Sequence, residues 1–234
     1  MLYEYNVINE KSEVQAKMNN YLYNYSYNPY SRQPITPSYI RLLHASPNAP
    51  AVDIYANGSP LARNLNYRGF TEYLAVPSGT YNIVVFRAGQ TTNPVLSTNI
   101  SIPDGSIFTV AAIGLLPNIT LLPVEEPRMN IPAGKLMLRF VHLSPNAPNV
   151  DLEMQPGGMA FRNVAYQGIT QYIPINPATY TFNLKVTGTD QRVLYVPNIR
   201  LEAGRFYTIY AIGIVAGNPP LQVVIPLDGN TYIP

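Results

Sequence analysis

The chain contains no cysteine and no tryptophan, and only 12% of its 234 residues are charged. Without cysteine it can form neither a disulfide framework nor a thiolate metal site. The charged share is about half of the ~25% that is usual in soluble domains. The net charge of +2 is too small to indicate a surface that follows nucleic-acid phosphates. Because a weakly charged surface protects poorly against association, the composition favours an assembly and no nucleic-acid partner.

Long apolar runs are missing as well. No stretch approaches the ~20 apolar residues that a membrane-spanning helix requires. The segment Met1–Ile8 lacks the basic start, the apolar core and the small-residue cleavage site of a secretory signal. We therefore expect a protein without a membrane span that is synthesised in the cytoplasm and leaves it by lysis or by an unusual route.

What the chain does contain is an internal repeat. Three segments occur twice, 98 or 99 residues apart: Arg41–Asp53 and Arg139–Asp151, Tyr67–Tyr73 and Tyr166–Tyr172, Phe108–Gly114 and Tyr207–Gly213. A period of this length is the size of a domain, so it predicts two tandem domains and not a solenoid. The predicted parts are an N-terminal arm (1–38), a first repeat (39–125), a linker (126–136) and a second repeat (137–234).

Each repeat has the pattern of an all-β protein. Short runs of β-forming residues are separated by turn signals every 8–12 residues, which is typical of an all-β sandwich. Asn57-Gly58 predicts a two-residue hairpin because both residues tolerate positive φ. Residues 206–214 are apolar on both faces, as in a central strand that is covered on each side. In the first repeat the predicted strands are residues 39–45, 51–57, 61–66, 70–76, 79–88, 94–102, 107–114 and 119–124.

The arm is rich in tyrosine. Its tyrosines are Tyr3, Tyr5, Tyr21, Tyr23, Tyr25, Tyr27 and Tyr30. Within residues 21–27 every second residue is tyrosine, so these rings share one face of an extended strand. Aromatic residues without a core of their own suggest a docking element that enters a neighbour's groove or joins the edge of its sheet. A low-complexity leader without a partner is the alternative.

The first repeated segment contains the motif His-x-Ser-Pro-Asn-Ala-Pro-x-Val-Asp, which holds the residue types of a catalytic triad. However, Ser46 directly precedes Pro47, and the chain has no Gly-x-Ser-x-Gly elbow. Two prolines per copy instead predict a structural corner, in which the serine and aspartate side chains bind backbone N–H groups and the histidine packs on proline or bonds a carbonyl. The corner residues are His44, Ser46, Pro47, Pro50, Asp53, His142, Ser144, Pro145, Pro148 and Asp151. We expect no catalytic residue.

Metal and cofactor sites are not expected either. One histidine and one aspartate per copy fall short of the ligand set of zinc. No alternation of Asp and Asn resembles a calcium loop, and no glycine-rich loop offers a phosphate site.

The motif from Arg41 to Tyr55 resembles the signature of a bacterial family catalogued as domain of unknown function 4397. The second copy carries it from Arg139 to Leu152 but has Glu153 in place of Tyr55. The resemblance covers about residues 39–125 and 137–227. It implies immunoglobulin-like or transthyretin-like β-sandwiches, often in tandem and often on bacterial surfaces, without an established activity. A tyrosine-rich, leaderless chain also resembles the coat and appendage proteins of endospores, which are released when the mother cell lyses.

These features together predict a non-enzymatic structural subunit. Its arm docks on the next copy and gives a head-to-tail homopolymer, which is a fibre or a layer on a bacterial spore or cell surface and which other coat proteins can join. A monomeric adhesion or glycan-binding module is the alternative. A hydrolase that uses Ser46 is the third hypothesis.

Overall fold

The structure, a computed structural model, describes residues 36–233. The seven arm tyrosines therefore lie outside the described residues. Within this part of the chain, sixteen β-strands and one short 3-10 helix form the regular structure, and the all-β prediction is confirmed. No helix between residues 36 and 233 has the length and apolar character needed to cross a membrane.

The first repeat is a sandwich of two four-stranded sheets, ordered β4-β1-β7-β8 and β3-β2-β5-β6. Asn57 and Gly58 join β2 to β3 with φ of 48° and 78°, which confirms the predicted hairpin. The sandwich core lies between the sheets and includes Ile40, Ile54 and Val85. The strands are β1 (Ser38–His44), β2 (Val52–Ala56), β3 (Ser59–Leu65), β4 (Leu74–Val76), β5 (Gly79–Arg87), β6 (Leu96–Ile102), β7 (Ile107–Ile113) and β8 (Thr120–Glu125).

The second repeat has the same topology, with sheets ordered β12-β9-β15-β16 and β11-β10-β13-β14. In each repeat the first and seventh strands pair in parallel, while the other pairs are antiparallel. The prediction of two tandem sandwiches is thus confirmed. The elements are β9 (Leu136–His142), β10 (Val150–Gln155), β11 (Gly158–Val164), β12 (Ile173–Ile175), β13 (Ala178–Val186), β14 (Arg192–Leu201), β15 (Phe206–Ile212), β16 (Gln222–Val224) and the 3-10 helix η1 (Gly229–Thr231).

One predicted strand of the first repeat is too long. Residues 70–76 were expected to be extended, but only Leu74–Val76 form a strand, and Phe70 makes an isolated bridge to Leu43. The cause is Thr71, whose hydroxyl accepts the backbone N–H of Leu42 at 2.9 Å. This side chain replaces the ladder partner that a longer β4 would supply.

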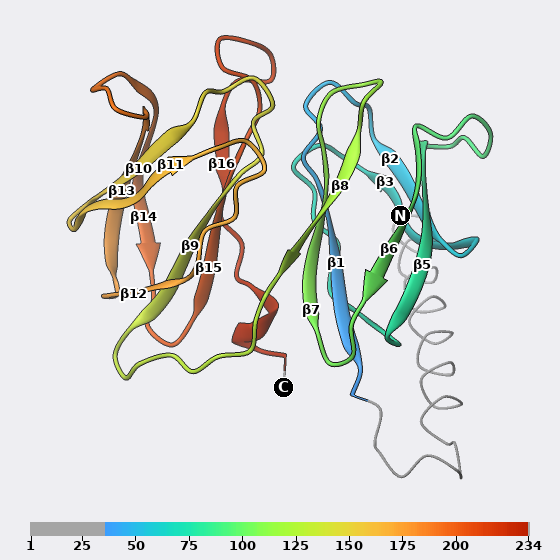
Figure 1. Ribbon diagram of the computed structural model, residues 1–234, viewed down its shortest axis with the longest axis horizontal. Helices are drawn as coiled ribbons and strands as arrows, with labels where there is room; N and C mark the ends of the chain where they lie inside the picture. The colour runs from blue at the N-terminus through green and yellow to red at the C-terminus, as the bar shows by residue number, and fades with distance from the viewer. Residues whose placement is uncertain (1–35, 234) are drawn as a thin grey trace, which may run out of the picture.

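The four sheets stack as four layers, and the two inner sheets face each other (Figure 1). Every residue of β7, β9 and β15 is buried, because one face of these strands covers its own sandwich core and the other face meets the opposite repeat. The strand predicted over residues 206–214 is therefore covered on both sides, and the second cover is the other repeat. The shared apolar cluster consists of Leu43, Ala45, Ala111, Ile113, Val124, Val141, Leu143, Tyr210 and Ile212.

Candidate functional site

The corner motif lies in the turns β1–β2 and β9–β10, and its polar atoms bond to the surrounding backbone. Nε2 of His44 is 3.0 Å from the carbonyl oxygen of Pro50, and the Ser46 hydroxyl donates to the carbonyl of Gly114 at 2.8 Å. Pro47 is buried and Pro145 is half-buried. The second copy repeats both contacts, at 3.2 Å and 2.7 Å, with His142, Pro148, Ser144 and Gly213.

This arrangement differs from a catalytic triad. The Nδ1 atom of His44 is 3.3 Å from the N–H of Ser46 and accepts it, so Nε2 is left as the donor to Pro50. Burial lowers the pKa of both histidines, and the carbonyl partner offsets this in part. The imidazole is therefore neutral, has both nitrogens occupied and does not contact the buried serine hydroxyl. Among residues 36–233, no group of three or more His, Asp or Glu is placed to hold a metal ion.

The two aspartates of the motif serve a different part of the fold than expected. Asp53 accepts the N–H of Asn64 at 2.7 Å and that of Gly89 at 2.9 Å, and not an N–H of the corner. Its neighbours Val52 and Ile54 face the core, so Asp53 points to the opposite side of the sheet, toward β3 and the turn after β5. Asp151 accepts the N–H of Asn163, as Asp53 accepts that of Asn64, and it also accepts the hydroxyl of Thr187. These bonds lower its pKa although burial alone would raise it.

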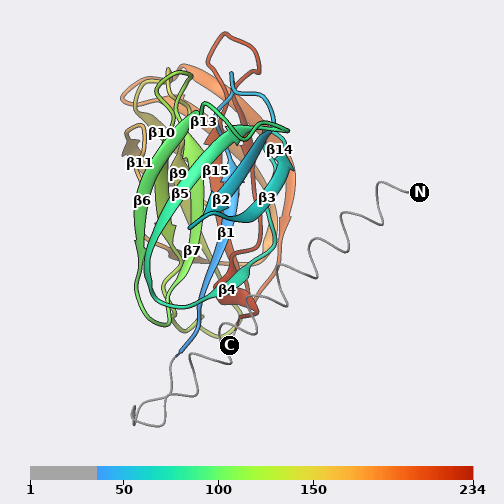
Figure 2. The same ribbon diagram turned by 90° about the vertical axis from the view of Figure 1, so that its right-hand side faces the viewer.

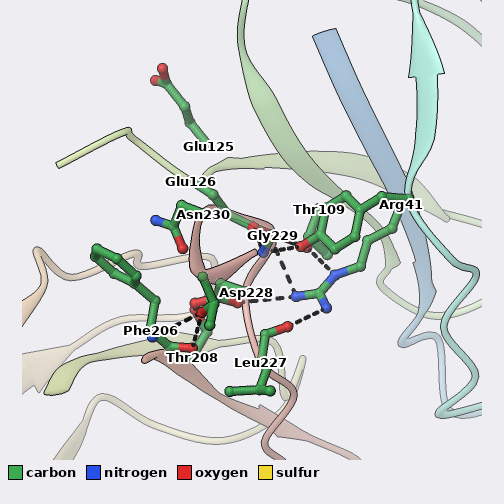
Figure 3. Close-up of polar contacts among 12 residues, drawn as sticks. Arg41, Thr109, Glu125, Glu126, Phe206, Thr208, Leu227, Asp228, Gly229 and Asn230 are labelled. Atoms are coloured by element: carbon green, nitrogen blue, oxygen red, sulfur yellow. Dashed lines mark hydrogen bonds and ion pairs between the residues drawn. The ribbon is translucent and has the colours of Figure 1, made fainter. Parts of the chain in front are cut away.

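A buried set of polar residues lies between the two sandwiches, at one end of the inner sheets (Figure 3). We call it the central polar cluster. Each repeat, taken with the segment that follows its last strand, contributes an arginine, a threonine, a tyrosine and a carboxylate. The members are Arg41, Tyr73, Thr109 and Glu126 from the first half of the chain, and Arg139, Tyr172, Thr208 and Asp228 from the second.

Arg41 connects the two halves of the cluster. Its Nε donates to the hydroxyl of Thr109 at 2.7 Å, and this hydroxyl donates in turn to Glu126. Its Nη1 reaches across to the carbonyl of Leu227 at 2.7 Å, and its Nη2 lies 3.0 Å from Asp228 and 3.5 Å from Glu126. A single guanidinium thus bonds one carboxylate from each half of the chain.

Arg139 repeats the threonine and carbonyl contacts of Arg41, but its buried Nη2 has no hydrogen-bond partner among residues 36–233. Its Nε donates to the hydroxyl of Thr208 at 2.7 Å, and its Nη1 donates to the carbonyl of Glu125 in the first half of the chain. Thr208 and Tyr172 both donate to Asp228. Each arginine therefore bonds a backbone carbonyl of the other half of the chain, at the last residue of β8 for Arg139 and just beyond β16 for Arg41. This is the reciprocal pattern of a two-fold dimer interface, here within one chain.

The electrostatics follow from burial. The two arginines, the two threonines and the two carboxylates are each at least 96% buried. The positive charges of the arginines balance the negative charges of the carboxylates. Burial and the nearby carboxylates raise the pKa of Tyr73 and of Tyr172, so both remain protonated donors. Burial and then the charge of Glu126 raise the pKa of Asp228 to about 6, against the opposing effect of the two arginines.

The C-terminal segment closes the cluster. The backbone N–H of Gly229 donates to Glu126 at 2.6 Å, and the Tyr73 hydroxyl lies 2.9 Å from the same nitrogen. A Cβ at residue 229 would lie 2.8 Å from the ring of Tyr73, so this position requires glycine. The side chain of Asn230 adds a bond to the carbonyl of Pro127 in the linker at 3.1 Å. The linker and the C-terminus thus hold the two repeats together.

Sequence reasoning did not identify this cluster. None of its eight members was predicted to belong to a functional site. A usable signal was present, because each of the three repeated segments supplies one polar residue to each half of the cluster, namely an arginine, a tyrosine and a threonine. Glu126 and Asp228 lie outside the repeated segments and had no such signal.

The outer faces of the two outer sheets differ at the positions of Tyr55 and Phe86, among others. In the sheet that faces the viewer in Figure 2, the rings of Tyr55 and Phe86 make an edge-to-face contact, with centroids 5.7 Å apart. The guanidinium of Arg63 lies 5.9 Å from the centre of the Tyr55 ring. The second repeat has Glu153 and Lys185 at these positions, joined by an ion pair of 3.1 Å.

A groove runs along one open edge of the first sandwich, between β6 and β8. Its volume is about 340 Å³. These two strands are the edge strands of their sheets on the same side of the sandwich. The lining residues are Leu96, Thr98, Asn99, Ile100 and Ser101 of β6 and Thr120, Leu121 and Pro123 of β8.

Comparison with known proteins gives one family and a set of distant folds. A family model described as "Domain of unknown function (DUF4397)" matches residues 38–153 and 155–231, which confirms the resemblance carried by the repeated motif. Comparison with curated proteins gives no match.

Three of the solved structures that match are remote. The Bacillus anthracis TIE protein has 14% identity and a TM-score of 0.25; the match covers 80% of this chain and 34% of that protein, so the chain spans about a third of its length. A family CBM26 module of Eubacterium rectale Amy13K, solved with maltoheptaose, has 11% identity and a TM-score of 0.26, with 83% and 99% covered. A putative cell adhesion protein of Bacteroides ovatus has 11% identity and a TM-score of 0.24, with 84% and 98% covered. Similarities this distant indicate no function.

Proposed function

The chain belongs to the family described as domain of unknown function (DUF4397), and we propose that it is a non-enzymatic structural subunit that assembles with further copies of itself through its N-terminal arm. The assembly is a fibre or layer on a bacterial spore or cell surface. The arm of one copy docks on the next copy, and this contact joins two different surfaces, so it propagates without closing.

One observation supports the proposal most strongly: the reactive residues that the chain repeats are all engaged inside the fold. The serine hydroxyls bond carbonyls, the histidines have both nitrogens occupied, and the aspartates tie strands together. The arginines, threonines and tyrosines of the central polar cluster join the repeats. Duplication has therefore preserved a building block, and the surfaces left for partners are the outer sheets, the open sheet edges and the arm.

The first prediction tests the arm. Replacing Tyr21, Tyr23, Tyr25 and Tyr27 by serine is expected to raise the concentration needed for self-assembly by roughly 100-fold or more, because burial of four rings is lost. Light scattering and negative-stain microscopy of the full-length protein measure the effect. Replacement of Tyr195 by serine is the control, since this tyrosine is exposed and lies outside the arm. Filaments that persist in the fourfold variant would contradict the proposal.

A second candidate function has an observation of its own. Tyr55 and Phe86 present half-buried aromatic surface on the outer face of β2 and β5, and sugar rings stack on such surfaces. The candidate is a glycan-binding module, in which the first repeat binds and the second does not.

The second prediction tests this candidate with residues that the chain itself supplies. The double variant Tyr55→Glu and Phe86→Lys transfers the Glu153–Lys185 pair of the second repeat to the first. If the face binds glycans, the wild type gives saturable binding on a glycan array and the variant loses about tenfold or more in affinity. The reverse transfer, Glu153→Tyr and Lys185→Phe, is the matched control. Equal signals from the wild type and the first variant would exclude this face as a glycan site.

A further inference from the structure

Strand β6 is an edge strand without the features by which proteins usually protect such edges. Its residues, Leu96–Ile102, include no charged residue and no proline. Its pairing with β5 continues from Gly79 to Val85 in regular register, without a bulge. Because an unprotected edge presents free backbone donors and acceptors, it is a template for one more strand.

The equivalent strand of the second repeat is protected in three ways. β14 contains Arg192 and Arg200, and Pro197 interrupts its donors. Its pairing with β13 is broken by two register shifts, and Asn198 has a φ of 61°. Charge, proline and bulges are the means by which natural sheets block strand addition. The two repeats therefore differ at this edge, although their topology is the same.

The groove beside β6 exposes apolar surface that an added strand would cover. Leu96 and Leu121 belong to the margin of the first core but remain only half-buried. The inward side of β6, with Thr98 and Ile100, forms one wall of the groove, and β8 forms the other. Pro123 lies in β8, so strand addition is favoured on the β6 side.

The sequence offers one segment that fits this edge. Residues 21–27 are as long as β6, about 23 Å when extended. Their tyrosines fall on one face and Leu22, Asn24 and Ser26 on the other, which matches a groove with an apolar inner side and a polar outer side. The outer side of β6 carries Ser97, Asn99 and Ser101.

The position where the described chain begins argues for a second copy as the source of this segment. The carbonyl of Thr36 accepts the N–H of Gly105, and Ser38 bonds the carbonyl of Pro103, so the chain leaves the fold beside the end of β6. Pro29, Pro34 and Pro37 lie in the sequence that connects residues 21–27 to the fold, and a proline-rich connection favours an extended path over a tight return to the same sheet.

We infer that β6 of one copy accepts residues 21–27 of another copy as an additional strand, with the tyrosines in the groove. This inference rests on the proposed function, because it names the surface that receives the arm. It also makes the contact heterologous, since the first repeat is the receptor and the arm is the ligand.

A pair of lysine substitutions in the full-length protein tests the acceptor. Thr98→Lys places a charge in the groove and is expected to raise the concentration needed for assembly about tenfold or more. Ser97→Lys places the same charge one residue away, on the outer face, and is expected to leave assembly unchanged. Equal assembly of the two variants overturns the inference. Circular dichroism and a thermal melt establish that both are folded.

Cross-linking tests the same contact without a charged substitution. The chain has no cysteine, so introduced thiols are the only ones present. Asn24 and Asn99 are the central residues of the two segments. A mixture of the Asn24→Cys and Asn99→Cys variants is expected to give disulfide-linked mixed dimers under mild oxidation, whereas Thr98→Cys, which points to the groove, gives far fewer. Absence of mixed dimers, or a cross-link only within one chain of the double variant, overturns the inference.

The outcomes separate this inference from the proposed function. If the tyrosine variants abolish assembly while the β6 variants assemble normally and no mixed dimers form, the arm binds another surface. In that case only the inference fails. If the wild type is monomeric at every concentration, both fail.

Discussion

Replacement of Arg41 by alanine is expected to lower the free energy of unfolding by about 3–5 kcal/mol, because it leaves buried carboxylates without their shared partner. Arg41 bonds both Asp228 and Glu126, and both carboxylates are fully buried. Water cannot replace the guanidinium without opening the interface between the repeats. For a chain of this size the loss corresponds to a fall of the melting temperature by about 10 °C.

Urea unfolding monitored by tyrosine fluorescence measures this loss. Arg200→Ala is the control, since its side chain is 80% exposed and its ion pair with Glu202 is loose at 3.7 Å. The control is expected to change the free energy by no more than about 0.5 kcal/mol. If Arg41→Ala lowers the free energy of unfolding by less than about 1 kcal/mol, the cluster does not hold the two repeats together as argued.

A double variant separates charge from packing. If the cost of Arg41→Ala arises from uncompensated charge, then adding Asp228→Asn removes one of the orphaned carboxylates and recovers part of the loss. If the cost arises from lost contacts of the arginine stem, the second substitution adds to it. The sign of the coupling between the two positions therefore identifies the cause.

The fold was predictable because its determinants are local. Turn residues such as Asn57-Gly58 and the alternation of apolar residues lie within a few positions of the strands that they specify. The exception at residues 70–73 is instructive, since the side chain of Thr71 bonds Leu42 from a distant part of the chain and the strand begins only at Leu74. A pattern read along the sequence cannot register a partner of this kind.

The central polar cluster was not predictable for the same reason. Its bonds join residues up to 187 positions apart, as between Arg41 and Asp228. The repeat did mark three of its four residue types, but it did not show that two copies of a segment meet each other. Because the inner sheets pack face to face, the duplication does more than repeat a unit. The second copy provides the surface that buries the first.

This relation explains why the inner strands are apolar on both faces. A lone sandwich with such strands would expose a large apolar face around Leu43 and Ile113, which soluble monomers rarely tolerate. In the tandem chain each repeat covers the other, and the polar cluster at one end of the contact fixes its register. The pair behaves as a two-fold dimer whose subunits are joined by a linker.

The last prediction concerns pH. Through Asp228, the stability of the protein is expected to fall as the pH rises from about 4 to about 7. The folded state raises the pKa of this carboxyl from 3.8 to about 6, so the folded protein holds its proton more strongly than the unfolded chain does. This contribution is complete below pH 3.8 and is lost as the pH rises through 6. A shift of about two units corresponds to roughly 3 kcal/mol.

The histidines act in the opposite direction over part of this range. Burial lowers the pKa of His44 and His142 below 6.5, so they destabilise the folded state as the pH falls below that value. The pH profile of the wild type alone therefore mixes two effects.

The difference in stability between the wild type and Asp228→Asn isolates the effect of the carboxyl, because the histidines are common to both proteins. Relative to the variant, the wild type is expected to be about 3 kcal/mol more stable at pH 4 than at pH 7, as measured by urea unfolding. A difference that stays constant, or that grows with pH, would mean that Asp228 is already ionised in the folded protein at acid pH and that the arginines outweigh its burial.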